Sequence, residues 1–164
     1  MSTGGCMAVD RNMVEHVLRL IPQQRPFRFI DRILDIGDDY ITGTYRFRHD
    51  EFFYRGHFPN KPVTPGVILV EAMAQTAVVA YGIYLLMRQG ITEDEISNMV
   101  TLFTMADEIE FNGIVSAGES VVVRGHKIYF RRGNLKMKVS MDRTTGENVC
   151  CGILTGRGVN IHEA

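Results

Sequence analysis

Apolar residues recur along the chain with two different periods, and these periods mark out the predicted elements. From Val9 to Ile21 they recur at three- and four-residue intervals, which predicts an amphipathic helix that Pro22 ends. The run from Gly66 to Met87 is apolar on almost every side and predicts one long buried helix. Between this run and the strands that follow, residues 90–97 are expected to form a polar linker.

Strict alternation of apolar and polar residues elsewhere predicts β-strands, because successive side chains of a strand point to opposite faces. The clearest cases are residues 41–48 and residues 135–142. Further strands are expected at residues 27–36, 101–111, 120–130 and 149–156, and a loop rich in proline and aromatic residues at 50–65.

The predicted order is therefore helix, two strands, one long helix and four strands. Short turns between the last strands favour antiparallel pairing. A helix that is apolar all round must be covered on most sides. We therefore predict an α+β fold in which an antiparallel sheet wraps around one long central helix. Residues 9–164 are expected to form a single domain, and residues 1–8 a disordered leader.

Charge and cysteine content narrow the function classes. The chain of 164 residues carries 18 basic and 19 acidic residues, so the basic excess typical of a nucleic-acid binder is missing. Cys150 and Cys151 are adjacent and poorly placed to bridge each other, and Cys6 lies near the start. We expect a reduced, cytoplasmic protein without a signal peptide.

The long apolar run could also be read as a membrane span. It contains Glu71 and Gln75 one turn apart, however, and a carboxylate is costly inside a lipid bilayer. Pro62 and Pro65 precede the run and no basic cluster comes directly before it. A buried core helix is therefore the preferred interpretation.

The start of this helix could bind a polar group of a ligand. Thr64 suits the N-cap and Pro65 the first helical position, which leaves the amides of Gly66 and Val67 unpaired at the positive end of the helix dipole. Because Gly66 has no side chain, a ligand carbonyl could approach closely. Such a helix end can stabilise an oxyanion.

Glu71 and His57 are the candidate acid and base near that helix end. Burial of Glu71 in an apolar helix would raise its pKa and keep the carboxyl protonated. His57 lies in the preceding loop between glycine and proline residues. Such a pair suits proton abstraction beside a thioester carbonyl and loss of a β-hydroxyl. The same residues also allow a non-catalytic interpretation, in which His57 has a structural role and the Glu71 carboxyl is hydrogen-bonded by Gln75. The histidines lack metal-ligand spacing, and no phosphate loop or dinucleotide fingerprint occurs.

Three motifs follow one another in this segment: Gly56-His57-Phe58-Pro59, Pro62-Val63-Thr64-Pro65-Gly66-Val67 and Glu71-Ala72-Met73-Ala74-Gln75. Together they resemble the signature of the (3R)-hydroxyacyl-carrier-protein dehydratases of fatty-acid synthesis. Upstream, Ile21-Pro22-Gln23-Gln24-Arg25-Pro26-Phe27 and Asp31-Arg32 resemble the opening segment of that family. The resemblance implies a hotdog fold, a lyase that needs no cofactor or metal, and acyl carrier protein with a phosphopantetheine-linked substrate as partner.

The resemblance also implies roles for individual residues. His57 would be the base at C2, Glu71 the acid at the leaving hydroxyl, and the Gly66 amide the carbonyl donor. The chain has glutamate at the acid position and contains no tryptophan. Within the family this combination is typical of plain dehydratases rather than of dehydratase-isomerases. The substrate-binding positions would be Gly66, Val67, Phe58, Gln75, Leu102 and Phe103. In this family the site lies at a dimer interface, so we expect a homodimer, which can assemble further into a hexamer as a trimer of dimers.

The chain departs from the family pattern at three places. Leu102 stands where many relatives have a tyrosine that gates the acyl tunnel. Asp107-Glu108-Ile109-Glu110 stands where relatives often carry basic residues after the aspartate, and Ala117-Gly118-Glu119 replaces a Pro-Gly-Asp turn. These changes bear on chain-length preference and on carrier docking. Docking charge could come instead from Arg25, Arg28, Arg46, Arg48, Arg55, Lys61, Arg131 and Arg132. A hotdog thioesterase and a non-catalytic acyl-thioester binding protein remain the alternative functions.

Overall fold

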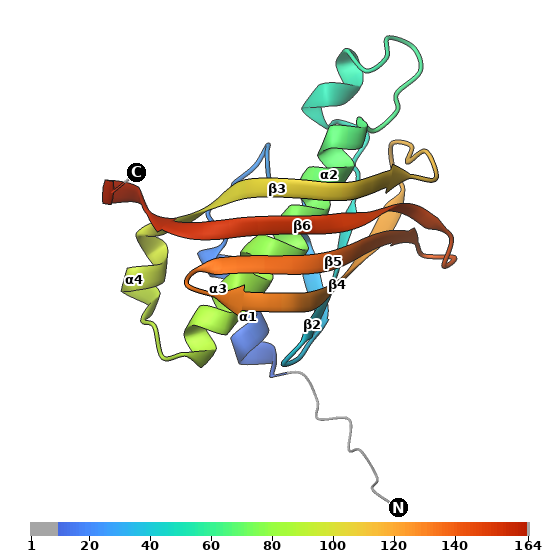
Figure 1. Cartoon of the computed structure of the whole chain (residues 1–164). Helices are drawn as coiled ribbons and strands as arrows, with labels where there is room; N and C mark the ends of the chain where they lie inside the picture. The colour runs from blue at the N-terminus through green and yellow to red at the C-terminus, as the bar shows by residue number, and fades with distance from the viewer. Residues whose placement is uncertain (1–9, 164) are drawn as a thin grey trace, which may run out of the picture.

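One helical rod runs across a face of a six-stranded sheet (Figure 1). The computed structural model describes residues 10–163, so the predicted leader at 1–8 lies outside the described residues. The rod consists of α2 (Gly66–Ala74), the π-helical segment η2 (Gln75–Ala80) and α3 (Tyr81–Arg88). This confirms the helix predicted over residues 66–87.

The sheet is antiparallel throughout and has the order β1-β2-β4-β5-β6-β3. Its strands are β1 (Arg32–Ile36), β2 (Tyr40–Arg46), β3 (Met99–Phe111), β4 (Ser120–Arg131), β5 (Asn134–Arg143) and β6 (Asn148–Asn160). The middle of the rod contacts β2, β4, β5 and β6, so the sheet curls around it. The predicted hotdog architecture is therefore confirmed.

The rod is the core helix of this fold. Among residues 10–163 it is the one helix long and apolar enough to span a membrane, and 72% of its apolar window is buried inside the molecule. Met73, Ala77 and Tyr81 are completely buried against strand residues such as Ile41 and Met137. This burial supports the core-helix interpretation over a membrane span.

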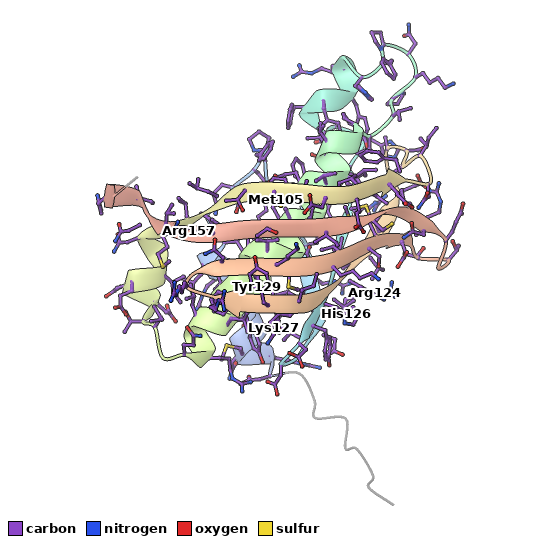
Figure 2. The ribbon with its side chains drawn as sticks, in the orientation of Figure 1. Met105, Arg124, His126, Lys127, Tyr129 and Arg157 are labelled. Carbon is purple, nitrogen blue, oxygen red and sulfur yellow. The ribbon has the colours of Figure 1, made fainter. Side chains whose placement is uncertain are left out.

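β2, β5 and the first half of β4 alternate as predicted, with one face on the rod and one face outside, whereas β3 is exposed along most of its length. Figure 2 shows the side chains of His126, Tyr129 and Arg157 on the outer face, which no helix covers within residues 10–163. Cys150 is buried whereas its neighbour Cys151 is partly exposed, and both are free thiols. Adjacent cysteines on opposite faces cannot bridge each other.

Residues 27–31 do not form a strand, although a strand was predicted over 27–36. β1 begins only at Arg32. The backbone before it is bound by a side chain: Gln75 donates from Nε2 to the Phe27 carbonyl at 2.9 Å and accepts at Oε1 from the Phe29 amide at 2.6 Å. These groups are therefore not available for pairing with another strand.

Two short helices pack at the C-terminal end of the rod. α1 (Arg11–Leu20) agrees with the helix predicted over residues 9–21 and begins after Asp10, which caps it. α4 (Glu93–Ser97) was wrongly predicted as part of a linker. Thr92 and Glu95 form a reciprocal capping box there, and the Thr-x-x-Glu spacing is the sequence signal that was missed.

β3 is an edge strand with an exposed apolar surface. It pairs with β6 on one side and, within the part of the chain that the structure describes, with no strand on the other. Phe103 is 45% exposed and Phe111 53% exposed. An unprotected edge of 13 residues with aromatic side chains is typical of a surface that pairs with another chain.

Candidate active site

His57 lies in a loop that projects beyond β3 at the N-terminal end of α2 (Figure 1). The loop starts with the 3-10 helix η1 (Phe52–Arg55) and ends at Thr64. The Thr64 hydroxyl lies 2.6 Å from the Tyr54 hydroxyl, and its amide donates to the Val115 carbonyl at 2.9 Å. The two ends of the loop are therefore joined to each other, and its second end is attached to the body of the domain.

The His57 ring is oriented by its own loop. Nδ1 lies 2.8 Å from the Val63 carbonyl oxygen, and because a carbonyl can only accept, Nδ1 carries the proton. In the neutral ring Nε2 then holds the lone pair, and it has no hydrogen-bond partner among the described residues. The Phe58 ring stacks on the imidazole with centroids 4.1 Å apart. His57 is thus set up to accept a proton at Nε2.

The N-cap of α2 lies one residue later in the chain than predicted. Pro65, not Thr64, occupies the N-cap position, because the Thr64 hydroxyl is used by Tyr54. The first backbone hydrogen bonds of the helix run to the Pro65 carbonyl from Ile68 and Leu69. The amides of Gly66 and Val67 precede these bonds and remain the donors at the helix start.

The surroundings of Gly66 are close-fitting. A Cβ atom at this position would lie 2.9 Å from a ring carbon of Phe111, so a side chain does not fit without movement of that ring. Val67 is 75% exposed beside it. The helix start is therefore an accessible pair of amide donors beside an apolar wall, which suits a carbonyl group of an apolar ligand.

Glu71 is partly buried about one and a half turns further along α2. Burial raises the pKa of its carboxyl, and the hydrogen bond from Gln75 opposes this only in part. Gln75 Nε2 donates to Glu71 Oε1 at 2.9 Å, as the one-turn spacing had suggested. The carboxyl is therefore held in one orientation and biased toward its protonated form.

Gln75 itself is fixed from three sides. It is completely buried and also binds the Phe27 carbonyl and the Phe29 amide. The predicted role of Gln75 as partner of Glu71 is confirmed. Its two backbone partners were not predicted, since a backbone carbonyl or amide carries no signal in the sequence.

His57 and Glu71 share no hydrogen bond or ion pair within one chain. Each has its own set of supporting contacts, one in the projecting loop and one in the helix. The single chain therefore holds two candidate half-sites apart, one with the free imidazole nitrogen of His57 and one with the carboxyl of Glu71.

Leu102 and Phe103, both predicted to bind substrate, point to opposite faces of the sheet. Phe103 pairs with Gly156, where an added Cβ would collide with Val78 of the rod, so this pair faces the rod. Leu102 pairs with Arg157, which lies on the outer face (Figure 2). Phe103 is therefore on the side of the sheet that carries the central helix.

An apolar cavity of about 40 Å³ lies at the other end of the rod. It is partly open to solvent, and its lining includes Leu20, Pro22, Val78, Gly82, Ile83 and Leu135. Val78 and Gly82 follow Glu71 and Gln75 at near-helical spacing, so these four residues lie toward one side of the rod. The sequence did not indicate this cavity, because it forms between elements that are distant along the chain.

No three His, Cys, Asp or Glu side chains gather into a metal-binding group within residues 10–163.

Comparisons with known proteins agree on one family. A FabA-like domain matches residues 21–154. The chain is 32% identical over 137 residues to the 3-hydroxyacyl-acyl-carrier-protein dehydratase FabZ of Petrotoga mobilis, covering 84% of this chain and 90% of that protein. It is 36% identical over 126 residues to the bifunctional enzyme LpxC/FabZ of Porphyromonas gingivalis, which covers 76% of this chain but only 26% of that longer protein.

Solved structures share the fold. The dehydratase heterocomplex ApeI:P from Xenorhabdus doucetiae superposes with a TM-score of 0.75 at 13% identity, covering 90% of this chain and 93% of that one. A hypothetical thioesterase from Streptococcus pneumoniae superposes with a TM-score of 0.54 at 13% identity, covering 79% of this chain and 85% of that one.

Proposed function

The chain belongs to the FabA-like family, together with FabZ dehydratases, and from this we propose that it removes water from (3R)-3-hydroxyacyl thioesters on acyl carrier protein. The product is the trans-2-enoyl thioester. The observation that carries the proposal is the state of Glu71. Its carboxyl is held by Gln75 and biased toward protonation by burial, as a group that must give a proton to a leaving hydroxyl requires.

We propose the following roles for the residues, which their geometry supports. The thioester carbonyl accepts hydrogen bonds at the start of α2, from the Gly66 amide, which polarises the C2–H bond. His57 Nε2 takes the C2 proton while the C2–C3 double bond forms. The C3–O bond breaks, and Glu71 gives its proton to the departing hydroxyl, which leaves as water. A proton passed from His57 back to Glu71 through solvent restores both groups.

We infer that a second copy of the chain completes each half-site. His57 is in a loop that projects past the β3 edge, and the aromatic side chains of that edge are exposed. Pairing of two β3 edges would cover Phe103 and Phe111 and bring the loop of each chain toward the helix of the other. We therefore propose a homodimer in which His57 of one chain acts with Glu71 of its partner.

The acyl chain needs an apolar space beside Glu71. Phe103 and Phe58 provide apolar surface near the half-sites, and the cavity near Gly82 lies toward the same side of the rod as Glu71. We propose that the acyl chain extends from Glu71 toward this cavity. The cavity would then limit the length of the acyl chain.

A thioesterase is the second candidate, because solved thioesterases have the same fold. In that reaction a carboxylate would activate water and would have to be ionised. Burial works against this state, since it raises the pKa of Glu71. The position of His57 in an ordered, oriented loop would also have no function in thioester hydrolysis.

One assay separates the functions. The purified protein is incubated with a (3R)-3-hydroxyacyl thioester of acyl carrier protein, and enoyl absorbance and free thiol are followed together. Enoyl product without thiol is the expected result. Release of thiol would instead identify a thioesterase, and neither product would identify a binding protein.

A further inference from the structure

Tyr45 of β2 lies between the supports of the two half-sites. Its side chain is almost completely buried, and its hydroxyl donates to Oε1 of Glu51. The ring packs edge-to-face against Phe29 with centroids 5.7 Å apart. One residue therefore touches both the segment that leads to His57 and the segment that holds Gln75.

Glu51 anchors the loop of His57. The side chain is only 9% exposed, and Oε1 also accepts from the Arg48 amide at 3.3 Å. Its backbone carbonyl accepts from the Tyr54 amide at 3.1 Å, at the first turn of η1. Because Glu51 directly precedes η1, a fixed carboxyl sets the position from which the projecting loop begins.

The contact with Phe29 leads to Glu71. The Phe29 amide donates to Gln75 Oε1 at 2.6 Å, and Gln75 Nε2 donates to Glu71 Oε1 at 2.9 Å. Tyr45 is therefore connected to the acid by one ring contact and two hydrogen bonds. It is connected to the loop of the base through Glu51.

Packing alone does not explain why the buried carboxyl of Glu51 lies beside Tyr45. An ionisable group taken out of water costs free energy unless hydrogen bonds replace its hydration, so apolar residues would fill the space with less cost. The hydrogen bond between the Tyr45 phenol and the Glu51 carboxyl instead fixes the relative position of these two groups, and it does so more narrowly than an apolar contact would. The nearby Arg48 guanidinium lies 5.3 Å from the centre of the Tyr45 ring and limits its motion further.

We propose that Tyr45 and Glu51 are positioning residues that hold the His57 loop in register with the support of Glu71. This inference rests on the proposed dehydration, in which the His57 half-site of each chain meets one substrate together with the Glu71 half-site of its partner, so that each chain must hold both half-sites at fixed positions. Neither side chain touches the substrate. A shift of the loop by about 1 Å would be enough to reduce turnover about 100-fold, since proton transfer depends strongly on alignment.

Tyr45→Phe tests the proposal, because it removes one hydroxyl and keeps the ring against Phe29. Tyr81→Phe is the matched control: Tyr81 is also buried, and its hydroxyl donates to the Gly37 and Asp38 carbonyls, which are remote from both half-sites. Both variants should lose a similar amount of melting temperature. Only Tyr45→Phe should lower kcat, by about 10- to 100-fold with KM within about threefold of wild type.

Glu51 provides the rescue experiment. Glu51→Gln keeps an oxygen that can accept from Tyr45 and from the Arg48 amide, so most of kcat should survive. Glu51→Leu removes the acceptor and should lower kcat as Tyr45→Phe does. A purely structural role would lower kcat only in proportion to the loss of folded protein, equally in Tyr45→Phe and Tyr81→Phe, and that result would overturn the proposal.

Hydrogen exchange gives a readout that does not depend on catalysis. The amides of His57 and Val63 are bonded within the loop, to the carbonyls of Phe53 and His57 respectively. They should exchange faster in Tyr45→Phe than in wild type or Tyr81→Phe. Unchanged exchange would refute the positioning role even if the wild-type protein proved inactive as a dehydratase, whereas inactivity of the wild type alone would refute only the proposed function.

Discussion

Gln75 Nε2 lies 2.9 Å from the Glu71 carboxyl and 2.9 Å from the Phe27 carbonyl, so one amide group connects the candidate acid to a loop 48 residues away. Glu71 therefore cannot turn without breaking a contact that also shapes the neighbouring backbone. The orientation of the acid and the stability of the domain depend on the same side chain.

Gln75→Leu should for this reason reduce both properties. The substitution leaves the Phe27 carbonyl and the Phe29 amide without partners in a buried place, and each such group costs about 1–3 kcal/mol. We expect the free energy of unfolding to fall by about 2–5 kcal/mol in equilibrium urea denaturation. Gln24→Leu is the control, because the side chain of Gln24 makes a single hydrogen bond, to the Ile21 carbonyl, and its loss should cost about 1 kcal/mol or less. Equal losses in the two variants would contradict this account.

Glu71→Gln should abolish turnover without harming the fold. Glutamine has the shape of glutamate but no acidic proton to give, so kcat should fall by about 10²–10⁴-fold while substrate binding is kept.

Wild-type activity should also fall with rising pH as Glu71 ionises. That alkaline limb lies above the ordinary carboxyl range because burial raises the pKa of Glu71. Glu71→Asp keeps the acid but shortens it, and should retain partial activity.

Stability should fall with rising pH, as activity does, because of the same residue. The Glu71 carboxyl loses its proton at lower pH in the unfolded chain than in the folded one, because burial raises its folded-state pKa. The contribution of Glu71 to stability is therefore fully present below the ordinary pKa of 4.5 and is lost as the pH rises through the raised one. Glu71→Gln lacks this dependence and should gain melting temperature relative to wild type as the pH rises toward neutrality. A constant difference between the two proteins across that range would refute the buried-acid description.

Two glycines should respond to alanine with opposite signs. A Cβ at Gly82 would lie 3.7 Å from Leu135 in ordinary contact, and alanine favours a helix by about 1 kcal/mol, so Gly82→Ala should stabilise the protein by about that amount. A Cβ at Gly156 would collide with Val78, so Gly156→Ala should destabilise it by about 1–3 kcal/mol. Thermal denaturation of the two variants checks both signs.

If Gly82 also borders the acyl site, Gly82→Leu should lower activity on long acyl chains more than on short ones.

The periodicities of the sequence predicted most of this fold because each strand and the rod bury a defined face. The Glu71–Gln75 contact could be predicted as well, since residues four apart on a helix are neighbours. Residues 27–31 could not, because their backbone is bound by a side chain 46–48 residues further along. The prediction of Thr64 as the N-cap was wrong for a similar reason. Its hydroxyl has a tertiary partner, Tyr54, that competes with the helix end.

The edge of β3 offers a direct test of assembly. Phe103→Lys places a charge in the apolar surface where a second copy is expected, so the dimer should weaken or dissociate. Ile128→Lys is the matched control, because Ile128 is 49% exposed and Phe103 45% exposed, but Ile128 lies on β4, away from the free edge. Light scattering should show a monomer or a concentration-dependent mixture for Phe103→Lys only. A stable dimer in both variants would place the interface elsewhere.

Removal of the base should stop catalysis while leaving the chain folded. Because His57 is partly exposed in a loop and its ring makes one hydrogen bond, to Val63, His57→Ala should keep a melting temperature near that of wild type. Loss of a positioned general base typically costs about 10²–10⁴-fold in rate. Turnover within a few-fold of wild type would mean that another group takes the C2 proton.

The two inactive variants together test whether the site is shared. If His57 of one chain acts with Glu71 of the other, a mixed dimer of His57→Ala and Glu71→Gln contains one site with both groups intact and one with neither. Random exchange of subunits makes about half of the dimers mixed, so the mixture should recover about a quarter of wild-type activity, although each variant alone is inactive. Subunit exchange must be verified, for example with differently tagged chains. An inactive mixture with confirmed exchange would show that His57 and Glu71 of the same chain serve one site, and that the projecting loop must then move toward its own helix during catalysis.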